Sequence, residues 1–145
     1  MFSTRWQLFR VFGIPIRLDM SWLIILCLLT WTFASQVFAS NLPNLGKPEL
    51  WGLGLITAVA FFLCILLHEL GHALVARPLG IPINGITLFL FGGVAEMAGE
   101  PLSPGGEFLM AVAGPLVSLV LGVVFLMLGA VGEKVHWGEP VILVL

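Results

Sequence analysis

The chain has 145 residues, of which 59% are hydrophobic and 10% are charged, and its mean hydropathy is +1.11. A soluble domain carries about a quarter of its residues as Asp, Glu, Lys and Arg, so this composition excludes an ordinary soluble protein and favours a multi-pass membrane protein. The formal net charge of −2 and the lack of any basic run argue against a nucleic-acid partner.

The first 39 residues contain a basic segment followed by an apolar one. Residues 1–19 carry three arginines against one aspartate, with apolar residues between them, so this segment is predicted to lie at the membrane interface. The stretch "SWLIILCLLTWTFASQVFA" is long enough to cross a bilayer core. We therefore predict a first spanning helix at about residues 21–39. A signal peptide cleaved after Ala39 is the alternative interpretation.

The second predicted helix carries the only cluster of ionisable residues at the end of a long apolar run. Residues 40–49 form a loop by their Asn, Pro and Gly content. The helix then extends over about residues 49–77 and ends before Pro78, with no proline in its interior. The motif "HELGH" at residues 68–72 is therefore expected on its last turns.

Residues 81–99 differ in composition from the helices on either side. They are rich in β-branched and aromatic residues and contain turn signals at Asn84-Gly85 and Gly92-Gly93. We predict a short membrane-associated β-hairpin or sheet here, between the second and third helices. The third helix is expected at about residues 106–132, with a kink at Gly114-Pro115.

The apolar residues 140–145 are interpreted as the start of a fourth helix that stops in mid-membrane, so the sequence is expected to be an N-terminal piece of a longer protein. The predicted fold class is an all-α polytopic membrane protein with three transmembrane helices, the start of a fourth and the β segment described above. Residues 1–145 are expected to form a single membrane-embedded core.

The distribution of lysine and arginine predicts the orientation in the membrane. One side of the predicted topology carries four of these residues: Arg5, Arg10, Arg17 and Arg77. The other side carries Lys47 and Lys134. This excess predicts that the N-terminus and the HELGH motif face the cytoplasm.

The HELGH motif has the spacing of a zinc site. His68 and His72 are four residues apart, so both rings project from one face of a helix and can reach a single Zn²⁺. Glu69 lies about 100° round the helix, beside the metal, where it can act as general base on a zinc-activated water. The sequence thus predicts a metalloprotease centre.

A catalytic zinc site takes three protein ligands, so this motif leaves one ligand to be found. The remaining histidine, His136, is expected on the opposite side of the membrane and is a poor candidate. Three carboxylates closer to the motif stay open as candidates: Glu96, Glu100 and Glu107.

Three stretches of the chain resemble the site-2 protease family of intramembrane zinc metalloproteases. They are "FGIPIRLDMSWLIILCLL", "LLHELGHALVARPLGIPINGITLFLFGGVAEM" and "GEFLMAVAGPLVSLVLG". They resemble most the bacterial and archaeal branch that includes the sporulation-factor processing proteases. The resemblance implies one Zn²⁺ per chain, with His68 and His72 as ligands and Glu69 as general base. It also implies a third ligand beyond Leu145, an aspartate in an Asp-Gly motif; the only aspartate present is Asp19.

The resemblance further implies a substrate and a location. Strand addition by an unwound transmembrane protein would occur at the segment Leu90, Phe91, Gly92 and Gly93. The expected membrane is a bacterial or archaeal plasma membrane, and the expected substrates are regulatory membrane proteins cleaved in or near their transmembrane segments. The chain departs from its relatives at Ser118, where they often carry asparagine. The oligomeric state stays open.

Two alternatives to an active protease remain at this stage. A non-catalytic membrane protein, such as a metal carrier or scaffold, could bind zinc through the same histidines. The chain could also be an inactive fragment of the protease that lacks the third zinc ligand. A glutamate between the two histidines favours catalysis, because a carrier does not need a base there.

Overall fold

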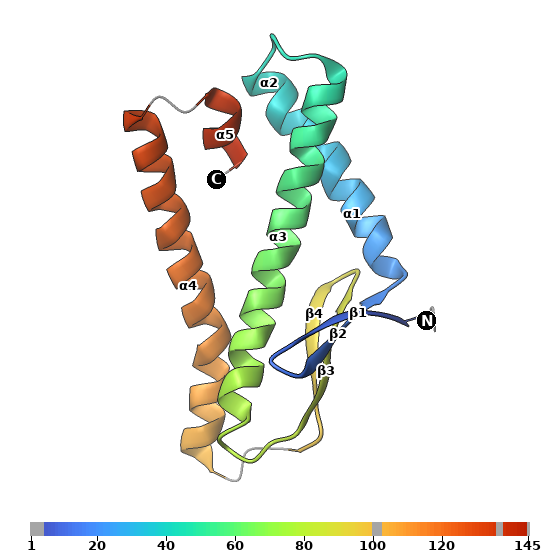
Figure 1. Ribbon diagram of the computed structural model, residues 1–145, viewed down its shortest axis with the longest axis vertical. Helices are drawn as coiled ribbons and strands as arrows, with labels where there is room; N and C mark the ends of the chain where they lie inside the picture. Colours follow the sequence, from blue (N-terminus) through green and yellow to red (C-terminus); the bar gives the residue numbers. More distant parts are fainter. Residues whose placement is uncertain (1–4, 100–102, 136–137, 145) are drawn as a thin grey trace.

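The computed structural model describes residues 5–99, 103–135 and 138–144. Three long apolar helices run roughly along its length, and a small sheet lies against one end of the central helix (Figure 1). These helices span Ser21–Asn41, Lys47–Ala76 and Pro104–Lys134. At about 1.5 Å per residue each is long enough to cross the hydrocarbon core of a bilayer. The chain is a multi-pass membrane protein.

The first span changes its winding along its length. It begins as α1 (Ser21–Thr32), continues as the π-helical segment η1 (Phe33–Phe38) and ends as α2 (Ala39–Asn41). A Cβ atom on Gly54 of the second span would lie 2.7 Å from the carbonyl oxygen of Thr30. The absence of a side chain at Gly54 therefore permits the close packing of the first two spans.

The second and third spans, α3 (Lys47–Ala76) and α4 (Pro104–Lys134), are antiparallel neighbours (Figure 1). Each has a proline in its first turn, where the missing N–H has no intrahelical partner to lose. The side chain of Ser103 caps α4 by accepting a hydrogen bond from the amide of Gly106. A short helix α5 (Glu139–Val144) follows.

The sheet has four strands in the order β1-β2-β3-β4. They are β1 (Arg5–Val11), β2 (Ile14–Asp19), β3 (Ile83–Phe89) and β4 (Gly92–Met97). The outer pairs β1–β2 and β3–β4 are antiparallel hairpins, whereas β2 and β3 pair in parallel, with Ile16 opposite Ile86. The sheet therefore joins the segment before the first span to the segment after the second.

The predicted all-α fold is wrong, because the sheet is mixed and four-stranded rather than a short hairpin between the second and third helices. Its other two strands come from residues 5–19, for which the sequence analysis predicted a position at the membrane interface but no strands. Their turn, Phe12-Gly13, has positive φ at both residues, 50° and 80°. Such turns favour Asn-Gly or Asp-Gly, so a phenylalanine there hides the hairpin from sequence reasoning.

The core lies between the sheet and the last turns of α3. It consists of six buried residues: Ile14, Ile16, Leu66, Leu70, Ala73 and Ile86. The three from α3 are spaced four and three residues apart and share one helical face. The sheet thus fixes the rotation of α3 about its axis, and with it the directions in which the HELGH side chains point.

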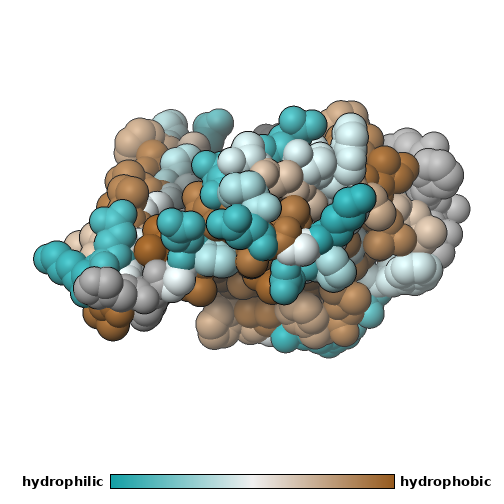
Figure 2. Space-filling view, turned by 90° about the horizontal axis from the view of Figure 1, so that it is seen from above, coloured by the Kyte–Doolittle hydropathy of each residue, from teal (hydrophilic) through white to brown (hydrophobic). Residues whose placement is uncertain are grey.

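Polar residues gather at the ends of the molecule. Seen from above, the end that carries the α2–α3 connection shows a hydrophilic centre with hydrophobic residues along its flanks (Figure 2). Many apolar side chains of the spans are exposed, including Leu119 at 65% and Leu126 at 75% on α4. This distribution is the one expected of helices surrounded by lipid.

Candidate active site

The HELGH side chains diverge from one turn of α3 toward two different neighbours. Residues on a helix follow one another at about 100°, so the two histidines point away from the sheet-facing side of α3. They meet α4, where each ring is held by a hydrogen bond. Glu69 projects on the side of α3 next to β4, against Gly93.

The two imidazole rings present their Nε2 atoms to each other at 3.2 Å. Two nitrogens bound at about 2.0–2.1 Å to one tetrahedral zinc ion lie about 3.3–3.4 Å apart. Both Nδ1 atoms are turned outward: that of His68 lies 2.8 Å from the Ser118 hydroxyl and that of His72 lies 2.6 Å from the Met110 carbonyl oxygen. The residues present fit two of the ligands of a zinc ion.

The carbonyl of Met110 determines which ring nitrogen of His72 carries the hydrogen. A carbonyl oxygen only accepts hydrogen bonds, so Nδ1 of His72 carries the proton and donates it. In the neutral ring Nε2 then keeps its lone pair, which is the form a metal requires. The Ser118 hydroxyl can play the same part for His68, since a hydroxyl accepts as well as donates.

Gly114 of α4 lies close to both imidazole rings. A Cβ atom built there would lie 2.5 Å from Nε2 of His68 and still closer to Nε2 of His72. No real side chain fits at that distance. The glycine of the Gly114-Pro115 pair, which the sequence identified only as a kink, therefore permits the close approach of α4 to both rings.

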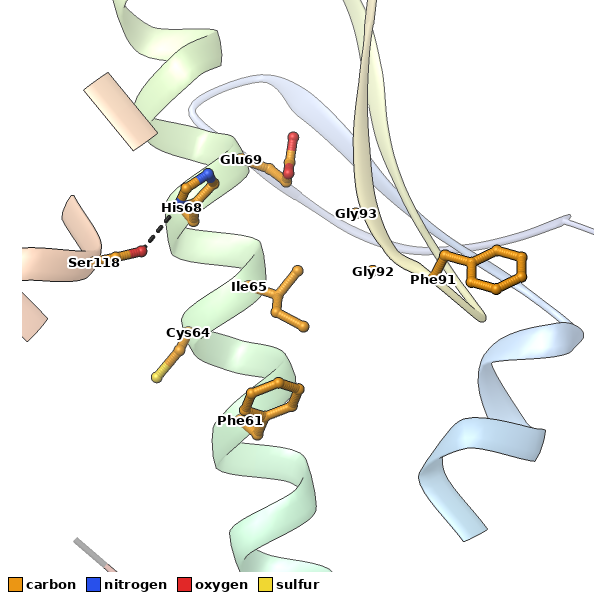
Figure 3. A pocket seen from close by; sticks show the side chains of 9 residues that line it. All are labelled: Phe61, Cys64, Ile65, His68, Glu69, Phe91, Gly92, Gly93 and Ser118. Carbon is orange, nitrogen blue, oxygen red and sulfur yellow. Dashed lines mark hydrogen bonds between the residues drawn. The ribbon is translucent and has the colours of Figure 1, made fainter. Parts of the chain in front are cut away.

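Glu69 opens onto a cavity of about 360 Å³ between α3, α4 and the β3–β4 turn (Figure 3). Its lining residues are Phe61, Cys64, Ile65, His68, Glu69, Phe91, Gly92, Gly93 and Ser118. A Cβ atom on Gly93 would lie 2.6 Å from Cγ of Glu69, so β4 approaches this carboxylate closely only because glycine stands there. The segment Leu90–Gly93 lies at the β3–β4 turn, with Phe91 86% exposed and directed away from α3 (Figure 3).

Of the carboxylates that the sequence left open, the two described ones, Glu96 and Glu107, do not join the histidines as a third zinc ligand. Glu96 lies on β4 and pairs with Arg17 at 2.9 Å, and Glu107 lies exposed in the first turn of α4. Glu100 and His136 lie outside the described residues. Within residues 5–99, 103–135 and 138–144, no three His, Cys, Asp or Glu side chains come together as a metal site.

Sequence reasoning missed two parts of this site. The Met110 carbonyl leaves no trace in the sequence, because any residue supplies a carbonyl. Gly114 was noted, but its contact with the histidines depends on how α3 and α4 pack. The position of Ser118 beside the histidines, by contrast, could be expected from the sequence. Ser118 follows Gly114 by four residues, so it lies one helical turn along the same face of α4.

An HELGH motif on a membrane-spanning helix, with both rings oriented by a second span, is typical of membrane-embedded metallopeptidases. The sequence model of Peptidase family M50 matches residues 56–142, and the chain belongs to this family. The resemblance to site-2 proteases inferred from the HELGH and Gly-Pro stretches is thereby confirmed.

The chain is similar to several zinc metalloproteases. It is 45% identical over 130 residues to a Synechocystis sp. protein provisionally named a zinc metalloprotease, covering 90% of this chain and 33% of that protein. It is 33% identical over 120 residues to the zinc metalloprotease of Methanocaldococcus jannaschii, covering 83% of this chain and 31% of that protein. The chain spans about a third of the length of these relatives.

A solved structure has a similar fold. The site-2 protease from Methanocaldococcus jannaschii superimposes with a TM-score of 0.62 at 30% identity, covering 88% of this chain and 52% of that chain. Together with the named relatives, this match supports a zinc metallopeptidase embedded in the membrane.

Proposed function

We propose that this protein is an intramembrane zinc metalloprotease that hydrolyses peptide bonds in or near the transmembrane segments of regulatory membrane proteins. The observation that carries the proposal is the arrangement around Gly114. Two Nε2 atoms lie 3.2 Å apart where Gly114 lets α4 approach both rings, while Glu69 and His68 line one cavity. One zinc ion per chain is the number that a single such pair supports.

In the proposed reaction, His68 and His72 hold the metal through Nε2, and Ser118 and Met110 keep both rings in the orientation that this requires. Zinc, when bound in such a site, polarises the scissile carbonyl and makes water acidic enough to be deprotonated near neutral pH. Glu69 takes that proton and passes it to the leaving amine. Glu69 and the ligand His68 line the same cavity, so a peptide bound there would lie next to both residues.

The substrate segment is proposed to enter the cavity in extended form beside β4. Strand β4 is the last strand of the sheet, so one of its edges has no strand partner within the described part of the chain. An unwound peptide could pair with this edge at Gly92 and Gly93, which line the cavity opposite Phe61 and Ile65. A transmembrane helix has to unwind before its carbonyl groups become accessible, so an open edge beside the base is what the chemistry needs.

The test uses the complete protein in proteoliposomes with a transmembrane peptide substrate and mass spectrometry of the products. Glu69→Gln preserves the size of the side chain but removes its basicity, so cleavage should fall by about three orders of magnitude or more while bound zinc stays at the wild-type level. Glu107→Gln is the matched control, because this exposed glutamate lies in the first turn of α4, and it should cleave normally.

Two results would overturn the proposal. Undiminished cleavage by Glu69→Gln would remove Glu69 as the base. A wild-type protein that binds zinc and cleaves none of a panel of transmembrane peptides would instead support the metal carrier or scaffold.

A further inference from the structure

Arg17 on β2 makes contacts across β3 to reach β4. Its Nη1 atom lies 2.9 Å from Oε2 of Glu96, and its Nη2 atom donates to the backbone oxygen of Asn84 at 3.3 Å. The second carboxylate oxygen of Glu96 accepts a hydrogen bond from the hydroxyl of Thr87 at 3.0 Å. One network of side chains therefore connects the N-terminal hairpin to the strand that borders the cavity.

The backbone of β3 is shaped to let the guanidinium pass. A Cβ atom on Gly85 would lie 2.8 Å from Nη1 of Arg17 and 3.0 Å from the carbonyl oxygen of Pro15. The β3–β4 register also shifts between Ile83 and Gly85. Any larger residue at position 85 would displace the Arg17 side chain. The contact between Arg17 and Glu96 therefore depends on the glycine at position 85.

The network lies on the face of the sheet opposite to α3. Ile16 and Ile86, the neighbours of Arg17 and Thr87 along their strands, are fully buried in the core with α3. Side chains alternate between the two faces of a strand, so the ion pair is on the outer face, with side-chain exposures of 27% for Arg17 and 28% for Glu96. On β4, Ala95 packs against the core and Gly93 meets Glu69.

We propose that Arg17 is a positioning residue for the active site, acting through Glu96 to hold β4 at its place and register beside Glu69. This inference rests on the proposed protease function. The clearance between Gly93 and the side chain of Glu69 is too small for one extra carbon atom. Without the pair, β4 can move only away from α3, which changes the edge offered to the substrate and leaves Glu69 in place.

A partly exposed ion pair contributes little to global stability, so its loss should leave the fold intact. It should instead act on the binding of substrate. The zinc-facing atoms are held by α3 and α4, and none of the hydrogen bonds of His68 and His72 involves the sheet. The expected signature is a raised KM with kcat and zinc content close to wild type.

The experiment compares Arg17→Glu, Glu96→Arg and the double variant with reversed charges, in the complete protein in proteoliposomes. Each single variant places like charges side by side, and we expect KM for a transmembrane peptide to rise about five- to tenfold with kcat within about twofold. The double variant restores an opposite-charge pair, and its KM should return to within about twofold of wild type.

A second measurement is independent of turnover. Cys64 lines the cavity beside the β3–β4 turn, whereas Cys27 is exposed on α1. A displaced β4 should raise the rate of maleimide labelling of Cys64 relative to Cys27 in the single variants and not in the double variant. Arg17→Gln removes the ion pair without adding repulsion, so it should raise KM and Cys64 labelling to a smaller extent. This variant replaces the charge reversals if they prevent folding.

The results separate this inference from the proposed function. Unchanged KM and unchanged Cys64 labelling in both single variants, with Glu69→Gln inactive, would overturn the positioning role and leave the protease intact. A lower kcat at constant KM, not rescued by the double variant, would indicate a general loss of folded protein and would also overturn it. A wild-type protein that binds zinc and cleaves none of the transmembrane peptides would remove the proposed function itself.

Discussion

The hydroxyl of Ser118 on α4 lies 2.8 Å from Nδ1 of His68 on α3, so one spanning helix orients a ring carried by another. Groups that bind the outer nitrogen of a metal-ligating histidine typically change metal affinity 10- to 100-fold when removed. The zinc affinity of this protein should therefore depend on a residue that cannot touch the metal.

Ser118→Ala is expected to weaken zinc binding by about tenfold, because the His68 ring loses the partner that fixes its rotation and its tautomer. Competition with a chromogenic chelator measures the change. Ser118→Thr keeps the hydroxyl and should bind zinc nearly as tightly as wild type. Equal affinity of the alanine variant and wild type would show that the bond to Ser118 does not orient the ring.

Gly114→Ala should abolish zinc binding and cleavage together, because the new methyl group would occupy the space in front of both Nε2 atoms. Gly122→Ala is the matched control on the same helix, since a Cβ atom there meets nothing within 4 Å. Metal content after purification distinguishes the two. Stoichiometric zinc in Gly114→Ala would contradict the placement of the metal between the rings.

Gly93→Ala should separate catalysis from metal binding. The added methyl group would collide with Cγ of Glu69, which displaces the proposed base but leaves the histidines untouched. We expect cleavage to fall at least tenfold while the zinc content stays unchanged. Both quantities are measured on the same preparation of the variant. Gly99→Ala, with open space around its Cβ position, should keep full activity.

The topology can be tested without any assay of function. The loop containing Asn44 and the end of α3 at Arg77 lie at opposite ends of a 30-residue helix. Single cysteines at these two positions, in a background without Cys27 and Cys64, should react with a membrane-impermeant maleimide from opposite sides, with position 77 on the cytoplasmic side. Labelling of both from the same side would contradict the orientation predicted from lysine and arginine.

Residues 1–145 produced alone should hold zinc weakly and cleave nothing. The described part of this chain brings two histidine ligands together and no third ligand, and sites with fewer ligands bind zinc less tightly. Metal analysis beside the complete protein decides this. Tight, stoichiometric zinc with peptide cleavage by residues 1–145 would show that the third ligand lies within this chain.

Sequence reasoning succeeded where the relevant geometry is local. The spacing of His68 and His72 predicts a shared helical face whatever the rest of the fold does, and α3 places them so. The three apolar runs likewise predict spans from length alone. Strands β3 and β4 lie within the predicted β segment, but they belong to a four-stranded sheet rather than to a short hairpin.

The parts that escaped the sequence depend on contacts between distant segments. Strand β2 pairs with its neighbour β1 and also with β3, which lies about 70 positions further along the chain, and neither β2 nor β3 carries a signal for the other. Gly114 acquires its role only through the packing of α4 on α3. The Arg17–Glu96 pair joins residues separated by 79 positions, so no local pattern around either residue indicates it.

Because β2 pairs in parallel with β3, formation of the sheet depends on correct insertion of the first two spans into the membrane. Two spans, α1 and α3, separate these strands, so the strands meet only if both helices have crossed the bilayer. A failed crossing would leave β3 on the far side and β2 without a partner. At about 5–20 residues per second, ribosomal synthesis of the intervening chain takes several seconds. Until then β2 presents an open edge, and open strand edges are prone to pair with other chains.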